Sequence, residues 1–137
     1  MPATMTNQHG EAIEWDGIGF LIVGPPNSGK SELALALVTA HDAHLVADDQ
    51  VLLDRTEQGV IATCPTAIKG MLHTRSGGFY TLPFIESTTI RFIVQSNIPA
   101  KPLSQPPKIN TPIHMLDLRD PHIVTHVYEL VTKYKAL

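Results

Sequence analysis

The sequence GPPNSGKS at residues 24–31 constrains this chain more than any other feature. An apolar run at residues 18–23 precedes it, and a segment rich in Leu and Ala at residues 32–40 follows it. A strand, a glycine-rich loop ending in Lys-Ser and a helix, in this order, are typical of a P-loop, which binds the phosphates of a nucleotide. We therefore expect an α/β fold with a nucleotide site at the start of its first helix. The alternative is a Gly/Pro turn that only joins a buried strand to a helix.

The residue types in this loop suit phosphate binding. Backbone N–H groups around a concavity, at the positive end of a helix, donate hydrogen bonds to phosphate oxygens. Pro25 and Pro26 have no N–H, so donation is expected from Asn27 onward, and Asn tolerates a positive φ. We predict that Lys30 reaches the β and γ phosphates and that Ser31 places its hydroxyl on Mg²⁺. The predicted nucleotide-binding residues are Gly24, Asn27, Ser28, Gly29, Lys30 and Ser31.

Size and composition narrow the class of protein. A length of 137 residues predicts one domain spanning residues 1–137. The composition, 43% apolar and 17% charged, is ordinary for a globular protein, and a net charge of -3 gives no basic surface for nucleic acid. The first nine residues lack the apolar segment of a signal peptide, and no apolar run approaches the ~18 residues of a membrane helix, so we expect no membrane partner and a cytoplasmic location. Cys64 is the only cysteine, and we expect a buried thiol without a disulfide.

Apolar and β-branched runs between turn residues predict a mixed sheet with the first helix packed on it. Asp16-Gly17 supplies the positive φ angles of a tight turn and predicts a β-hairpin of residues 12–15 and 18–23. Leu33 and Leu37 share one face of a helix predicted over residues 31–40. Further strands are predicted at residues 44–47, 51–53, 60–62, 90–94 and 113–116.

The C-terminal part is predicted to hold a proline-rich loop and a second helix. Pro99, Pro102, Pro106, Pro107 and Pro112 predict a surface loop over residues 96–112. Asp120 and Pro121 predict the start of a helix, with Asp as its cap and Pro at its first position. His122 and His126 lie four residues apart on this helix, a spacing that suits Zn²⁺, but no third ligand accompanies them, and we expect an exposed pair.

Two adjacent acids, Asp48 and Asp49, end the predicted strand that follows the first helix. The ends of strands in open α/β sheets gather the ligand site, so we expect one acid to handle a proton and the other to help hold Mg²⁺. Adjacent side chains of a strand point to opposite faces, and both acids can serve one site only if the strand ends or bends there. The alternative is two solvated acids. His9, judged from the residues alone, is an exposed histidine before the hairpin.

Several of these segments together resemble the catalytic domain of HPr kinase/phosphorylase, most closely its short single-domain form in α-proteobacteria. The matching segments are HG at residues 9–10, GPPNSGKS at 24–31, ELAL at 32–35, HLVADD at 44–49 and PTAIKG at 65–70. The resemblance is distinctive up to about residue 75 and weaker at residues 90–94 and 117–120. It implies an ATP-dependent kinase that acts on a serine of the phosphocarrier protein HPr, a fold similar to phosphoenolpyruvate carboxykinase, and a hexamer.

The resemblance also implies roles for single residues. Asp48 matches the aspartate that takes the serine proton in the kinase direction and returns it in the reverse, phosphorylase direction. Asp49 matches its neighbour on the metal side, which with Ser31 gives the implied Mg²⁺ ligands. His9 matches a histidine near the catalytic aspartate, and Arg75 matches the arginine of a later signature. A serine hydroxyl is a poor nucleophile, and a carboxylate within hydrogen-bond reach is the usual remedy in phosphoryl transfer.

The chain departs from the family pattern at two places. The later signature, Leu-Glu-Val-Arg-Gly-Leu-Gly, is here LHTRSGG at residues 72–78, so His73 stands where the family has a glutamate that helps hold Mg²⁺. Imidazole suits Mg²⁺ poorly, which predicts a weaker metal site. After Val94 the chain has only the proline-rich loop and one helix. These departures favour the alternative function, a P-loop module that binds nucleotide without transferring phosphate; a small-molecule kinase is a third possibility.

Overall fold

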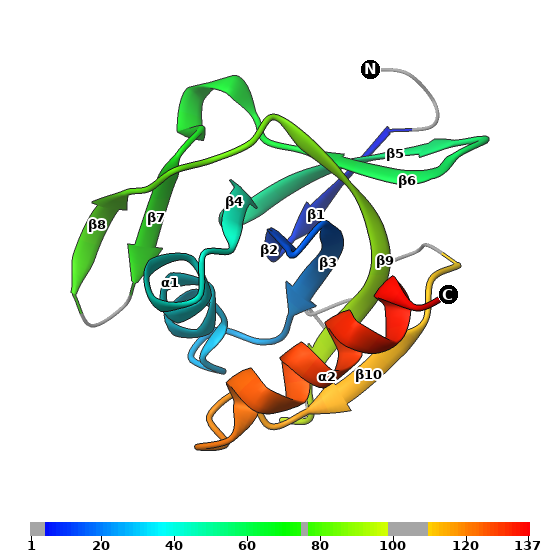
Figure 1. Cartoon of the computed structure of the whole chain (residues 1–137). Helices are drawn as coiled ribbons and strands as arrows, with labels where there is room; N and C mark the ends of the chain where they lie inside the picture. The colour runs from blue at the N-terminus through cyan, green and yellow to red at the C-terminus, as the bar shows by residue number, and fades with distance from the viewer. Residues whose placement is uncertain (1–4, 75–76, 99–109) are drawn as a thin grey trace.

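The computed structural model describes residues 5–74, 77–98 and 110–137. Within these residues, eight strands form one mixed sheet that carries two helices, and a separate two-stranded hairpin lies beside the first helix (Figure 1). The expected α/β fold with a mixed sheet is confirmed. The strands are β1 Met5–His9, β2 Glu11–Trp15, β3 Ile18–Val23, β4 His44–Ala47, β5 Gln50–Thr56, β6 Gly59–Thr63, β7 Met71–Thr74, β8 Gly78–Thr81, β9 Ser87–Ser96 and β10 Ile113–Leu116. The helices are α1 Lys30–Ala40 and α2 Ile123–Lys135, with a 3₁₀ turn at Thr66–Ile68.

The strand that enters the P-loop, β3, lies in the interior of the sheet. The strand order is β1-β5-β6-β9-β3-β2-β4, and β10 also pairs with β9. β3 pairs antiparallel with β2 and parallel with β9, and all six of its residues are buried. The predicted hairpin of β2 and β3 is confirmed, with Asp16 at φ 54° and Gly17 at φ 83° in its turn. Both positive angles match the tight turn that fits the twist of paired strands.

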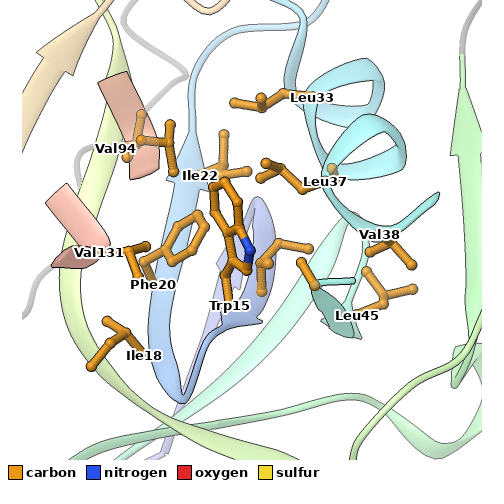
Figure 2. Close-up of a cluster of buried hydrophobic side chains, with 14 of the residues drawn as sticks. Trp15, Ile18, Phe20, Ile22, Leu33, Leu37, Val38, Leu45, Val94 and Val131 are labelled. Atoms are coloured by element: carbon orange, nitrogen blue, oxygen red, sulfur yellow. The ribbon is translucent and has the colours of Figure 1, made fainter. Parts of the chain in front are cut away.

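Alternation along β3 divides the core between the two faces of the sheet. Phe20 and Ile22 pack into the cluster under the helices, whereas Leu21 and Val23 belong to a second cluster on the other face. Figure 2 shows Leu33 and Leu37 of α1 pointing toward the sheet in the first cluster. The predicted apolar face of α1 is confirmed, and its packing fixes the P-loop between two buried elements.

The structure corrects the start of the second helix and adds elements that the sequence did not reveal. α2 begins at Ile123 with His122 as its cap, not at Pro121 with Asp120 as its cap. Asp120 instead closes a separate turn: its Oδ1 accepts the N–H of His122 at 2.7 Å, and its carbonyl accepts the N–H of Ile123 at 2.9 Å. β1, β7 and β8 were not predicted. His122 is exposed, and His126 is half-buried with its Nε2 3.6 Å from Asp120 Oδ2. Most of the predicted proline-rich loop, residues 99–109, lies outside the described residues.

The expectation of a buried thiol at Cys64 is confirmed. Cys64 is buried, and burial raises the pKa of its thiol, as expected of an unreactive cysteine. Within the described part of the chain, neither helix is long and apolar enough to cross a membrane.

His114 on β10 is expected to make the fold sensitive to acid. Its Nε2 lies 2.8 Å from the hydroxyl of Tyr134 on α2, and burial, followed by the charge of Lys133, lowers its pKa. The unfolded chain then binds this proton more readily than the folded one, so His114 costs stability as the pH falls below about 6.5. Between pH 7.5 and pH 5.5, we expect the melting temperature of His114→Gln to fall by less than that of the native protein. An equal loss in thermal melts of both proteins would contradict this.

Candidate active site

The P-loop takes the conformation that phosphate binding needs. Asn27 has φ 68°, as its predicted tolerance of a positive angle allows, and Gly29 has φ 102° immediately before α1. The N–H of Ser28 bonds to the carbonyl of Pro25 at 3.2 Å and closes the turn. Because the first N–H groups of a helix have no partner within it, the N–H groups of Lys30 and Ser31 remain free to donate at the loop. This end of α1 therefore has the geometry that suits an anion.

A cleft of about 420 Å³ opens beside this loop. Four of the six predicted nucleotide-binding residues line it, and so do three further predicted site residues. The first four are Asn27, Gly29, Lys30 and Ser31, and the other three are His9, Asp48 and Asp49.

The other two predicted nucleotide-binding residues, Gly24 and Ser28, are not among the residues that line the cleft. A Cβ on Gly24 would come within 2.7 Å of Ser28 Oγ, so only glycine fits there. Arg75 lies outside the described residues.

Both acids face the cleft because the strand ends before them. β4 stops at Ala47, Asp49 takes φ 72°, and the N–H of Gln50 bonds back to the carbonyl of Asp48 at 2.8 Å. This tight turn meets the condition under which adjacent acids can share one site.

The two carboxylates have different surroundings. Asp48 is 6% exposed; its Oδ2 accepts the backbone N–H of His73 at 2.9 Å, and its Oδ1 has no partner. The Asp49 side chain is 62% exposed, and its Oδ1 lies 2.8 Å from Nε2 of His9. The histidine therefore lies against Asp49, the acid that the family resemblance assigns to the metal. Asp48 keeps one buried acceptor atom without a hydrogen-bond partner.

Lys30 is held inside the loop that it serves. Its Nζ donates to the carbonyls of Gly24 at 2.8 Å and Pro25 at 3.1 Å. Burial lowers its pKa, and the neighbouring carboxylates, Glu11 first, oppose that shift. The amine is thus already positioned at the loop before a ligand binds.

The structure adds one site residue that the sequence reasoning missed, Glu11. This first residue of β2 is 1% exposed and lines the cleft. Its Oε2 accepts the N–H of Asp49 at 2.9 Å, and its Oε1 accepts the hydroxyl of Ser31 at 3.3 Å. Burial, followed by the nearby Asp48 carboxyl, raises its pKa well above the usual range. The sequence pattern that could have revealed Glu11 is the alternation of side chains along β2. It places Glu11 on the same face as the core residues Ile13 and Trp15.

These residues fit a magnesium–nucleotide complex. Mg²⁺ prefers oxygen ligands and is usually held by one or two carboxylates together with substrate phosphates. Ser31, Asp49 and Glu11 offer such oxygens beside the phosphate-binding loop. No three His, Cys, Asp or Glu side chains of the described residues form a ready metal site, so the phosphates would complete the coordination. Asp48, whose buried Oδ1 has no partner, lines the same cleft.

The fold and the cleft together define a P-loop α/β protein with acidic residues opposite the loop. The family model described as the HPr Serine kinase C-terminal domain matches residues 2–85, and the chain belongs to that family.

Curated relatives and a solved structure agree with this assignment. HPr kinase/phosphorylase of Bordetella pertussis is 41% identical over 88 residues, which are 64% of this chain and 28% of that protein. HPr kinase/phosphorylase of Clostridium tetani is 40% identical over 81 residues, which are 59% of this chain and 26% of that protein. The chain therefore matches only about a quarter of the length of these relatives. The structure of the Hpr(Ser) kinase/phosphatase from Coxiella burnetii has the same fold, with a TM-score of 0.75 at 22% identity, covering 96% of this chain and 90% of that one.

His73 is the position at which a weaker metal site is predicted. Its ring stacks on Phe79 with centroids 4.4 Å apart, and both residues line the cleft. We expect His73→Glu to lower the Mg²⁺ concentration needed for half-maximal ATP turnover, because a carboxylate adds an oxygen ligand and a negative charge. His73→Gln removes the ring without adding charge and is the matched control. If His73→Glu brings no gain while the native protein already works well with Mg²⁺, this position does not weaken the metal site.

Proposed function

We propose that this chain is a magnesium-dependent ATP kinase that phosphorylates a serine of an HPr-type phosphocarrier protein. The observation that carries the proposal is the Oδ1 atom of Asp48. Asp48 lines the cleft beside the P-loop, and its Oδ1 is buried and has no hydrogen-bond partner. A buried acceptor beside a phosphate site is what a general base for a hydroxyl requires. Membership of the HPr Serine kinase family and the names of the relatives support this choice of substrate.

The proposed chemistry is transfer of the γ-phosphoryl group. Asp48 Oδ1 accepts the proton as the serine O–H bond breaks, and the serine oxygen forms a bond to the γ-phosphorus. The bond between that phosphorus and the β–γ bridging oxygen breaks, and ADP leaves with the electron pair. In the phosphorylase direction, an oxygen of inorganic phosphate would lose its proton to Asp48 and form a bond to the phosphorus of phosphoserine. The bond between that phosphorus and the serine oxygen would break, pyrophosphate would leave, and Asp48 would return the proton to the serine oxygen.

Neighbouring groups support these steps electrostatically. Lys30 and the N–H groups that begin α1 face the negative charge of the phosphates. Mg²⁺, when bound, neutralises phosphate charge, and Ser31 and Asp49 are its proposed ligands. The His73 N–H holds Asp48 in place, and His9 does the same for Asp49. Arg75 is proposed to act on the transferring phosphate as well.

The rim of the cleft suits a protein substrate. Phe79 is 73% exposed and Met71 42% exposed, and both line the cleft beside the P-loop. Exposed apolar side chains at the mouth of a site are typical of a surface that a partner protein covers. The proposal therefore includes docking of the phosphocarrier on the β7–β8 hairpin, a cytoplasmic location and, from the family resemblance, assembly of six copies.

The test uses the full chain, Mg²⁺, ATP labelled on its γ-phosphate, and HPr from the same organism. We expect the label to appear on HPr and to require Mg²⁺. Label on a small molecule of a cell extract, with none on HPr, would identify a small-molecule kinase instead. Nucleotide binding with no transfer to either would identify a binding module, and both of these results overturn the proposal.

A further inference from the structure

The carboxylates around the cleft outnumber the positive groups that face them. Among the described residues, the cleft is lined by one lysine, Lys30, and by four carboxylates, Glu11, Glu32, Asp48 and Asp49. Lys30 already bonds to two carbonyls of its own loop. A nucleotide adds several more negative charges to the same space. This excess of negative charge calls for a cation between the carboxylates and the phosphates.

Packing of the fold alone gives little reason for a carboxylate at Glu11. It is 99% buried in a strand whose other inward side chains are apolar, and its bonds are to the Asp49 N–H and the Ser31 hydroxyl. Burial raises the pKa of this carboxyl, and two neutral donors compensate poorly for its charged form. Both partner residues, Ser31 and Asp49, line the cleft.

The spacing of the oxygens fits a shared cation. Glu11 Oε1 lies 3.3 Å from Ser31 Oγ. Neighbouring ligands of an octahedral Mg²⁺ lie about 3 Å apart, because each is about 2.1 Å from the metal at a right angle to the next. One cation can therefore contact both atoms after a small adjustment. A second observation points the same way: Asp48 lines the same cleft, and its buried Oδ1 has no hydrogen-bond partner.

We infer that Glu11 is a direct ligand of the divalent cation that accompanies the nucleotide, next to Ser31 and on the side of Asp49. This inference rests on the proposed nucleotide site and extends it by one residue. It gives the site a carboxylate near Ser31 although His73 supplies none.

The test measures the affinity of Mn²⁺ for the protein saturated with ADP, by electron paramagnetic resonance of the free ion. We expect Glu11→Gln to weaken Mn²⁺ binding about tenfold or more while ADP still binds without metal. Glu14→Gln is the matched control: Glu14 is also on β2, accepts a hydrogen bond from Thr88 at 2.6 Å and does not line the cleft. It should bind Mn²⁺ like the native protein. Equal Mn²⁺ affinity in Glu11→Gln and the native protein would overturn the inference.

Thermal melts separate a ligand from a structural residue. If Glu11 binds the metal, Glu11→Gln should melt no lower than the native protein without metal, since a neutral amide of the same size replaces a buried ionisable carboxyl. The variant should also gain less melting temperature from Mn²⁺ with ADP. A lower melting temperature with an unchanged gain from Mn²⁺ would mean that Glu11 only supports the fold. If Glu11→Gln does not fold, Glu11→Asp takes its place: its shortened carboxylate should weaken Mn²⁺ binding, and native affinity would overturn the inference.

These measurements do not depend on phosphate transfer. Loss of Mn²⁺ affinity in Glu11→Gln, together with a native protein that fails to label HPr, would support the metal ligand and refute the proposed kinase. Native Mn²⁺ affinity in Glu11→Gln, together with a native protein that labels HPr, would refute Glu11 as a metal ligand and support the proposed kinase.

Discussion

Asp48→Asn is expected to reduce phosphate transfer to HPr about 10²- to 10⁴-fold, the usual contribution of a general base. The amide is nearly the same size as the carboxylate and can still accept the His73 N–H through its oxygen. It cannot take the serine proton. ATP affinity should remain close to native, because a base that acts only along the reaction path does not hold the nucleotide. The rate is measured with labelled ATP and the affinity by calorimetry.

The control for this variant is Asp42→Asn, an equal change at an exposed residue that does not line the cleft. It should transfer phosphate at the native rate. A normal rate in Asp48→Asn would remove Asp48 from the chemistry.

Lys30→Ala is expected to weaken ATP binding about 10- to 100-fold. A hydrogen bond to a charged group contributes about 1.5–3 kcal/mol, and Lys30 faces the predicted β and γ phosphate positions from inside the loop. Calorimetry of ATP binding to a folded variant measures the effect. Lys69→Ala removes a lysine that pairs with Glu86 at 2.6 Å and does not line the cleft, so it should keep native affinity. Unchanged ATP binding in Lys30→Ala would contradict the phosphate site itself.

Local signals predicted the part of the site that lies close together in the sequence. The P-loop, the hairpin turn at Asp16 and the helix after Ser31 depend on a few neighbouring residues, and the structure has all three. The turn that aims Asp48 and Asp49 into one cleft was stated only as a condition. Its cause is the left-handed conformation of Asp49, which one sequence cannot reveal.

Contacts between distant residues explain what the sequence did not predict. Glu11 is buried because its partners, Ser31 and the Asp49 N–H, are 20 and 38 residues away. β1 is a polar edge strand that owes its form to pairing with β5, and β7 and β8 are too short to show a period. The start of α2 was misplaced because Asp120 bonds within its own turn rather than to the helix.

The most direct test of the account is mass spectrometry of HPr after incubation with the native chain, Mg²⁺ and ATP. We expect HPr to gain the mass of one phosphoryl group, located on a serine, and Asp48→Asn to leave HPr unmodified over the same time. Unmodified HPr with the native chain, under conditions in which calorimetry shows ATP bound, would contradict the claim that this cleft is a protein kinase site.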